Sequence, residues 1–234
     1  MTFRWKYIKG KMKLCREITL SRLHLQTDFA GYNTILDFVK QHGICRLPGD
    51  VAEIGAFMGG GTRKLGKFFK KHGKNVIVVD VFDPTFDYTL NERGEAMSYI
   101  YQKILGNRDL MDIFKKNVAD LTNVIVHPID SKKMYFNGTY RFCFSFIDGN
   151  HDPGYVKSDF ELLWEKTVEG GVVALHDYGG DLPQVTSAID SLIKDHKAEI
   201  GDIRKMASKC FIFIRKKEGQ SERKTGANSY KTKC

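Results

Sequence analysis

Acidic side chains follow five apolar segments of the sequence, at the point where each predicted strand ends. These residues are Glu53, Asp80, Asp130, Asp148 and the pair His176–Asp177. An aspartate after a strand is also an ordinary turn or helix-cap residue, so each of them has a structural explanation when taken alone. Five such positions are more than turns and helix caps alone would explain. Because α/β proteins bind ligands at the carboxyl ends of their strands, we expect a polar binding site there.

A glycine-rich loop follows the first of these acids, and it reads Glu53-Ile-Gly-Ala-Phe-Met-Gly-Gly-Gly-Thr62. The dinucleotide fingerprint G-x-G-x-x-G would need glycine at Phe57, so NAD or FAD binding is disfavoured. The phosphate loop G-x-x-x-x-G-K-[ST] would need lysine at Gly61, so nucleotide triphosphate hydrolysis is also disfavoured. What remains is a carboxylate beside glycines that permit a close backbone approach to a ligand.

The first two acids indicate which ligand would fit. A carboxylate at Glu53 suits a ligand that carries an ammonium group, and Asp80 at the end of the second strand suits ribose hydroxyls. A ligand that contains both an amino acid and a nucleoside would satisfy both positions.

Alternating strand and helix patterns position these residues. The predicted strands are 50–54, 75–80, 124–126, 142–147, 172–175 and 210–214. The predicted helices are 29–41, 62–72, 96–105, 109–118, a helix through 156–163 and another through 185–193. Strands that are apolar throughout and alternate with helices indicate a mostly parallel sheet covered by helices.

The length of 234 residues fits one domain with appendages. We expect a basic N-terminal extension (1–28), one α/β domain (29–215) and a disordered basic tail (216–234). Five scattered cysteines without a C-x-x-C pair indicate neither a disulfide framework nor a zinc site. The sequence shows neither an apolar run of about 20 residues nor a secretory signal, which predicts a cytoplasmic location.

The net charge of +9 lies at the ends of the chain, since residues 1–25 carry +6 and residues 204–234 carry +8. A nucleic-acid-binding face would run through the folded body, whose balance is −5, so a nucleic acid partner is disfavoured. The ends are interpreted either as solvated tails or as contacts with an anionic surface or acidic partner. The aromatic and basic stretch 3–11 would suit a membrane interface.

Two parts of the sequence resemble class I S-adenosylmethionine (SAM)-dependent methyltransferases. VAEIGAFMGGGT followed by VIVVD resembles their first two motifs, and FSFIDGNHDPGYVKSDFELLWEKTVEGGVVALHDY is similar to later motifs of methyltransferase domain family 24. The resemblance covers roughly residues 47–178 and extends to 214. It implies a Rossmann-like α/β sandwich, with a mostly parallel seven-stranded sheet whose last strand is antiparallel and helices on both faces.

The resemblance also implies SAM as the cofactor and places it residue by residue. Glu53 and Gly55 would face the methionine part, Asp80 would bind the ribose, and Asp148 would sit at the methyl-transfer centre. Asp130 and Ser131 would lie beside the adenine. The remaining positions expected to contact the cofactor are Ala56, Gly59, Gly60, Thr62 and Val81.

The acceptor chemistry has several candidates. Some related small-molecule O-methyltransferases use a divalent cation that lowers the pKa of the substrate hydroxyl, and here Asp148, His176 and Asp177 would be its ligands. Such a set suits Mg²⁺ or Mn²⁺; the alternative for His176–Asp177 is cofactor contact without a metal. Position 150 is Asn where relatives often have Asp, so His151 becomes the candidate catalytic base, with a capping or stacking loop histidine as its alternative.

The sequence therefore predicts a SAM-dependent methyltransferase that methylates a small molecule at a hydroxyl oxygen. A sugar or other polyhydroxylated metabolite is the leading acceptor, and that preference rests on the resemblance alone. Tyr155 and Tyr178 are predicted to line the acceptor pocket, and the segment 82–94 is predicted to act as a lid. The alternatives are a nucleic-acid methyltransferase recruited by the basic ends and a SAM-binding protein without turnover. A homo-oligomer is a further partner expectation.

Overall fold

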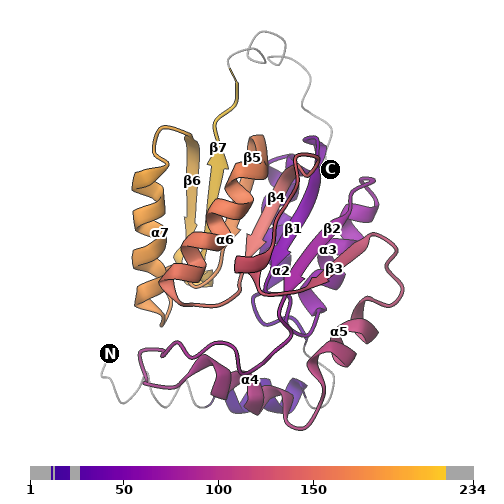
Figure 1. Cartoon of the computed structure of the whole chain (residues 1–234), viewed down its shortest axis with the longest axis vertical. Coiled ribbons are helices and arrows are strands. Elements are labelled where there is room, and N and C mark those ends of the chain that lie inside the picture. The colour runs from indigo at the N-terminus through magenta and orange to yellow at the C-terminus, as the bar shows by residue number, and fades with distance from the viewer. Residues whose placement is uncertain (1–11, 13, 22–26, 220–234) are drawn as a thin grey trace.

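A seven-stranded sheet forms the centre of the computed structural model, which describes residues 12, 14–21 and 27–219 (Figure 1). The strands lie in the order β3-β2-β1-β4-β5-β7-β6. Their bounds are β1 Asp50–Ile54, β2 Val76–Asp80, β3 Val124–Pro128, β4 Phe142–Ile147, β5 Thr167–Leu175, β6 Ile200–Met206 and β7 Phe211–Lys216.

The strand pairing confirms the predicted fold class. β1 pairs in parallel with β2 and β4, and the parallel pairs β2–β3 and β4–β5 extend the sheet on either side. β7 is antiparallel to both β5 and β6. The reversal of sequence order between β1 and β4 is the topological switch point, at which α/β sheets of this kind bind ligands.

β6 has no counterpart among the apolar runs of the sequence. It forms the edge of the sheet and has no fully buried residue, with Ile200 and Ile203 half-buried and Arg204 and Lys205 exposed. Because an edge strand is partly solvated, it can carry charged residues such as these and does not form a continuous apolar run. The strand predicted over 172–175 is longer in the structure, because β5 begins at Thr167 and runs through Gly170 and Gly171 with a register irregularity against β4.

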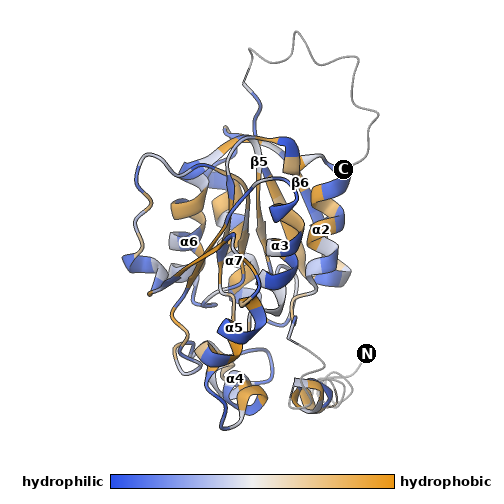
Figure 2. Cartoon of the chain, turned by 90° about the vertical axis from the view of Figure 1, so that its right-hand side faces the viewer, coloured by the Kyte–Doolittle hydropathy of each residue, from blue (hydrophilic) through white to orange (hydrophobic). Residues whose placement is uncertain are grey.

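Helices cover both faces of the sheet. Their bounds are α2 Tyr32–Gln41, α3 Gly60–Lys70, α4 Met97–Leu105, α5 Leu110–Val118, α6 Pro153–Lys166 and α7 Pro183–Asp195. α6 and α7 contribute Phe160, Leu163, Ile189 and Leu192 to one core cluster, whereas α2 and α3 contribute Ile35, Val39, Leu65 and Phe69 to the other. Figure 2 shows α6 on one side of the sheet and α2 and α3 on the other.

The two cores explain why the central strands read as continuous apolar runs. In β2, Val76 and Val78 pack into the core beneath α2 and α3, while Ile77 and Val79 pack into the core beneath α6 and α7. All four side chains are at most 1% exposed. A strand buried on both faces loses the polar alternation that a half-solvated strand keeps.

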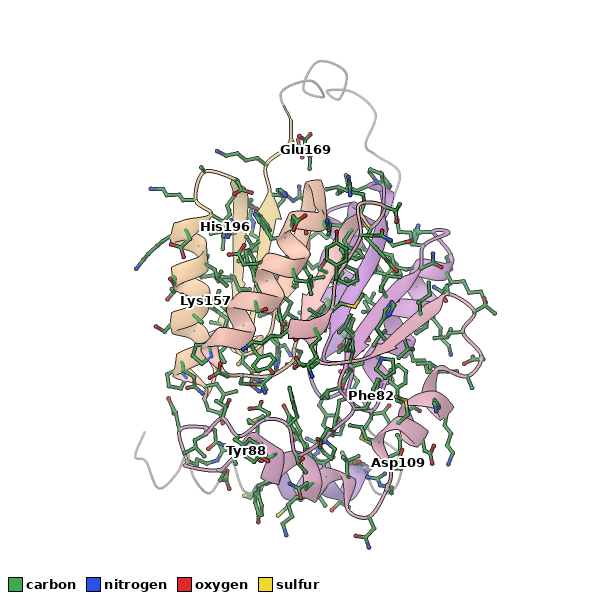
Figure 3. All side chains as sticks on the ribbon, in the orientation of Figure 1. Phe82, Tyr88, Asp109, Lys157, Glu169 and His196 are labelled. Atoms are coloured by element: carbon green, nitrogen blue, oxygen red, sulfur yellow. The ribbon has the colours of Figure 1, made fainter. Side chains whose placement is uncertain are left out.

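A cap lies across the carboxyl ends of the parallel strands, made of α4, α5, the loop 81–96 and the N-terminal helical residues 12 and 14–21 (Figure 1). Its core contains Met58, Ile104, Leu105, Leu110 and Ile113, with Leu14 and Ile18 packed against them. In Figure 3, Phe82 lies between the sheet and α5, where its ring centroid is 4.8 Å from that of Phe114.

Part of the predicted N-terminal extension therefore packs on the domain. Arg108 donates hydrogen bonds to the Ser21 carbonyl oxygen (2.9 Å) and hydroxyl oxygen (2.8 Å). At the other end, β7 stops at Lys216, and the Gly219 amide donates to Glu169. The predicted membrane-interface stretch 3–11 and the tail from 220 onward lie outside the described residues. None of the described helices combines the length and the apolar character needed to cross a bilayer.

Candidate active site

A cavity lies between the carboxyl ends of the strands and the cap. Most of the site residues expected from the sequence line it, namely Gly55, Ala56, Asp80, Val81, Asp130, Ser131, Asp148, His151, His176 and Asp177. They come from the loops after β1, β2, β3, β4 and β5. Aspartates that are far apart in the sequence thus lie around one cavity, because the parallel topology places the ends of these strands side by side.

Glu53 lies behind the cavity wall rather than in it. Its side chain is fully buried, and its two oxygens accept hydrogen bonds from the Tyr32 hydroxyl and the Thr62 hydroxyl, each at 2.6 Å. Burial raises the pKa of Glu53 to about 7, against the effect of these two hydrogen bonds. Tyr32, which the sequence alone did not reveal, lines the cavity in its place.

Asp80 ties the glycine-rich loop to the end of β2. Its Oδ2 accepts hydrogen bonds from the amides of Ala56 (2.7 Å) and Phe57 (2.9 Å), and its Oδ1 accepts one from the amide of Phe82 (2.6 Å). Burial raises the pKa of Asp80 and the three amides oppose that rise. Phe57 and Phe82 have positive φ of 47° and 52°, a strained conformation that these hydrogen bonds hold in place.

The glycines of the loop serve close approaches within the chain. A Cβ at Gly55 (φ 85°) would lie 2.1 Å from the Asp148 carbonyl oxygen, so the loops after β1 and β4 meet there. A Cβ at Gly60 would lie 2.3 Å from Thr27, and one at Gly61 would lie 2.2 Å from the Tyr32 ring. Gly60 thus accommodates Thr27 and Gly61 accommodates the Tyr32 side chain of α2, and Gly61 also lines the cavity.

Two histidines and three aspartates form a connected cluster in the cavity wall, where the loops after β2, β4 and β5 meet. His151 Nδ1 lies 2.5 Å from Asp87 Oδ2, and His151 Nε2 lies 2.9 Å from Asp177 Oδ2. His176 Nδ1 lies 3.2 Å from Asp148 Oδ1 and 3.1 Å from Asp177 Oδ2. Asp177, whose φ is 59°, thus joins both histidines. Four of these five residues are predicted site residues, and Asp87 lies in the predicted lid segment 82–94.

The carboxylates of this cluster control the charge of both histidines. Burial disfavours an imidazolium at His151, but the hydrogen bonds and charges of Asp177 and Asp87 outweigh that effect and raise its pKa to about 10. The pKa of His176 is likewise raised well above its ordinary value by Asp148 and Asp177, against the effect of burial. Burial would raise the pKa of Asp177, but the two histidines lower it far below its ordinary range.

The donor atoms of this cluster fit a divalent cation. Among the described residues, Asp148, His151 and Asp177 offer ligand atoms that all lie within 4.8 Å of one another. Two carboxylates with an imidazole nitrogen are a donor set suited to Mg²⁺, Mn²⁺ or a similar transition-metal ion. This set shares Asp148 and Asp177 with the predicted one and contains His151 where the prediction had His176.

The two predicted pocket tyrosines have different positions. Tyr155 lines the cavity, where its hydroxyl lies 3.4 Å from Asp130 Oδ2 and its ring centroid lies 5.6 Å from that of Phe86. Tyr178 does not line the cavity, so that prediction is wrong; its hydroxyl donates to Asp190 Oδ1 on α7 at 2.8 Å. The side chain of Tyr178 turns from the strand end toward the α6–α7 core.

The loop 81–96, which contains the predicted lid segment 82–94, is bound to the site. Asp87 Oδ2 accepts from the His151 amide as well as facing the His151 ring, and Asn150 Nδ2 donates to the Phe86 carbonyl oxygen (3.2 Å). Arg93, which lines the cavity, pairs with Glu95 and Asp181, each at 2.7 Å. Tyr88, labelled in Figure 3, lies on the outer side of this loop with 75% of its surface exposed.

Comparison with known proteins identifies the class. A family model described as a methyltransferase domain matches residues 52–178, more than half of the chain. The chain belongs to this methyltransferase family, and its fold is that of class I, SAM-dependent methyltransferases. This confirms the resemblance on which the sequence prediction rested. No curated protein matches the chain.

Solved structures show the same fold. The O-methyltransferase NovP matches with a TM-score of 0.64 and 17% identity, covering 81% of this chain and 80% of that one. The calicheamicin methyltransferase CalS11 matches with a TM-score of 0.59 and 14% identity, covering 90% and 92%. The N-methyltransferase NodS from Bradyrhizobium japonicum WM9, solved with S-adenosylhomocysteine (SAH), matches with a TM-score of 0.51 and 11% identity, covering 89% and 98%.

Proposed function

We propose that this protein transfers the methyl group of SAM to a hydroxyl oxygen of a small polyhydroxylated acceptor, with a sugar as the leading class. The observation that carries the proposal is the cluster of Asp148, His151, His176 and Asp177 beside the glycine-rich loop, because hydroxyl methylation needs a means to remove or stabilise a proton. Two proteins of similar structure support it, since NovP is an O-methyltransferase and CalS11 is a TDP-rhamnose 3′-O-methyltransferase.

The cofactor half of the cavity would be the part lined by the loops after β1, β2 and β3. Asp80 would face the ribose, Asp130 and Ser131 the adenine, and Gly55 and Ala56 the methionine part. Glu53 would act through Tyr32 and Thr62, whose hydroxyls it holds. Gly59, Gly60 and Val81 complete the proposed set by shaping the loops.

The acceptor half would be the part lined by the cluster and the loop 81–96. The sulfonium of SAM is a strong electrophile, so the protein mainly has to align donor and acceptor. A divalent cation held by Asp148, His151 and Asp177 would act as a Lewis acid that lowers the pKa of the acceptor hydroxyl. Asp87 and His176 would hold the ligand side chains in place, as outer residues of metal sites do.

The arrangement favours His151 as a cation ligand over the role of general base that the sequence suggested. Both of its ring nitrogens face carboxylates, and its pKa of about 10 keeps it protonated near neutrality. A protonated imidazole can neither accept the hydroxyl proton nor bind a cation, so binding of the cation would release the proton of Nε2 and leave the Nδ1 proton donated to Asp87. We assign the acceptance of the hydroxyl proton to the carboxylate of Asp148 rather than to Asp177, because the two histidines hold the pKa of Asp177 far below its ordinary range.

The test is a methyl-transfer assay that measures SAH release with a panel of free sugars, glycosides and nucleotide sugars, before and after chelation and with Mg²⁺ or Mn²⁺ added back. We expect acceptor-dependent SAH release that falls on chelation and recovers with the metal. The Asp148→Asn variant should bind SAH and lose turnover. SAH binding without turnover on any acceptor would support the non-catalytic alternative, and methylation of RNA or DNA in parallel reactions would contradict a small-molecule acceptor.

A further inference from the structure

Asp159 is a buried acid that the proposed chemistry does not use. It lies in the middle of α6, its side chain is 1% exposed, and neither of its carboxyl oxygens has a hydrogen-bond partner in the described part of the chain. A buried polar group without a partner is destabilising. Such a group in a folded domain therefore calls for an explanation beyond packing.

The position of Asp159 supplies that explanation. A Cβ on Gly149 would lie 3.3 Å from Asp159 Oδ2, so the carboxyl group lies directly against the turn that follows Asp148. On its other side is the short helix η2 (Ser131–Lys133), whose residue Ser131 lines the cavity. Asp159 itself does not line the cavity. It lies behind two of the loops that line the cavity, the loop after β3 and the loop after β4.

We propose that Asp159 is a positioning residue for the adenosine half of the cofactor, because its buried carboxyl group supports from behind the loops that carry Asp130, Ser131 and Asp148. This inference rests on the proposed cofactor site. It adds Asp159 to that site as a residue that lies outside the cavity and fixes the position of the cavity wall.

The charge of the carboxyl group decides how well it can support these loops. Burial raises the pKa of Asp159 to about 7; the Ser131 hydroxyl and Lys132 lower it, and the charge of Asp130 raises it. The remaining titratable group facing it is Tyr155, one turn earlier on α6. The neutral carboxyl can donate a hydrogen bond to its neighbours, whereas the ionised carboxylate is buried and repels Asp130, which the Ser131 hydroxyl and Lys132 offset only in part. The neutral form should therefore bind the cofactor more tightly.

The experiment measures the dissociation constant of SAH by calorimetry between pH 6 and pH 8.5. Wild-type affinity should weaken as the pH rises above about 7, by up to about tenfold per pH unit if one proton is taken up on binding. Asp159→Asn, which stays neutral, should keep the affinity of the low-pH form and lose this component of the pH dependence. Glu165→Gln, an exposed position on the same helix, is the matched control and should follow the wild-type protein.

Comparison between variants is needed because Glu53 also has a pKa of about 7. The readout is the difference between the wild-type and Asp159→Asn profiles, which a merely structural role in α6 would leave unchanged. Asp130→Asn is the second variant: it removes the charge that an ionised Asp159 repels, so its profile should also flatten.

Identical pH profiles for wild type and Asp159→Asn would overturn the inference. An Asp130→Asn profile as steep as that of the wild type would also overturn the inference. This second outcome keeps the inference testable if Asp159→Asn fails to fold. Failure of the wild-type protein to bind SAH at any pH would instead refute the proposed cofactor site. The two failures are therefore distinguishable.

Discussion

Removing the Asp80 carboxylate should destabilise the fold and weaken cofactor binding together. In Asp80→Ala, three backbone amides lose their acceptor at once, those of Ala56, Phe57 and Phe82. Two of these residues, Phe57 and Phe82, have left-handed conformations that would lose the hydrogen bonds from Asp80. The glycine-rich loop would lose its attachment to β2.

The magnitude follows from the number of bonds and the burial of the group. A hydrogen bond to a charged group contributes about 1.5–3 kcal/mol to stability. Burial opposes the charged form of Asp80, as its raised pKa shows, so we take a lower value of about 1 kcal/mol for each amide. The expected loss is about 3 kcal/mol, which corresponds to a fall in Tm of roughly 6–12 °C for a chain of this size.

The assay is urea unfolding with thermal denaturation as a second probe. Asp80→Asn, which keeps one carbonyl oxygen as acceptor, should fall between wild type and Asp80→Ala. Asp83→Ala is the matched control on the same loop, and since Asp83 is exposed it should change stability by no more than about 1 kcal/mol. An Asp80→Ala variant as stable as Asp83→Ala would refute the assignment of Asp80 as the tie between the two loops.

Three further predictions concern the rest of the site. Gly61→Ala should lower Tm and SAH affinity, since the new Cβ would lie 2.2 Å from the Tyr32 ring, whereas Gly138→Ala, with nothing within 4 Å, should change neither; equal effects of the two would contradict the packing described. The pKa of His151 is about 10 in the fold and about 6.5 when unfolded. Its stabilisation is therefore complete below pH 6.5 and lost as the pH rises toward 10, so wild-type Tm should fall more steeply than that of His151→Gln between pH 7 and 10. Mn²⁺ should raise the Tm of wild type but not of Asp177→Asn, as followed by calorimetry; equal shifts would place the cation elsewhere.

The fold was predictable because its central strands are buried on both faces. β1, β2 and β4 appear in the sequence as apolar runs bounded by glycine or acidic residues. This pattern predicted both the parallel sheet and the acidic residues at the carboxyl ends of its strands. β6 was not predicted because it is a partly solvated edge strand, in which Arg204 and Lys205 interrupt the apolar residues. Resemblance to the family, rather than any pattern in that segment, supplied the seventh strand.

The site was predictable only where function depends on position along one strand. Asp80, Asp148 and Asp177 each follow a strand, so the topology brings them together whatever the side-chain details. Tyr32 and Asp159 come from helices, and their roles depend on tertiary contacts to Glu53 and to the turn at Gly149. A single sequence carries no local signal for such contacts, since a tyrosine or aspartate in an amphipathic helix has many ordinary roles.

A crystal structure of the protein with SAH tests the central claim most directly. We predict SAH in the cavity at the carboxyl ends of β1 and β2, with its ribose at Asp80, its adenine beside Asp130 and Ser131, and its sulfur toward Asp148. SAH bound elsewhere on the chain, or lying with its sulfur away from Asp148, would contradict the account.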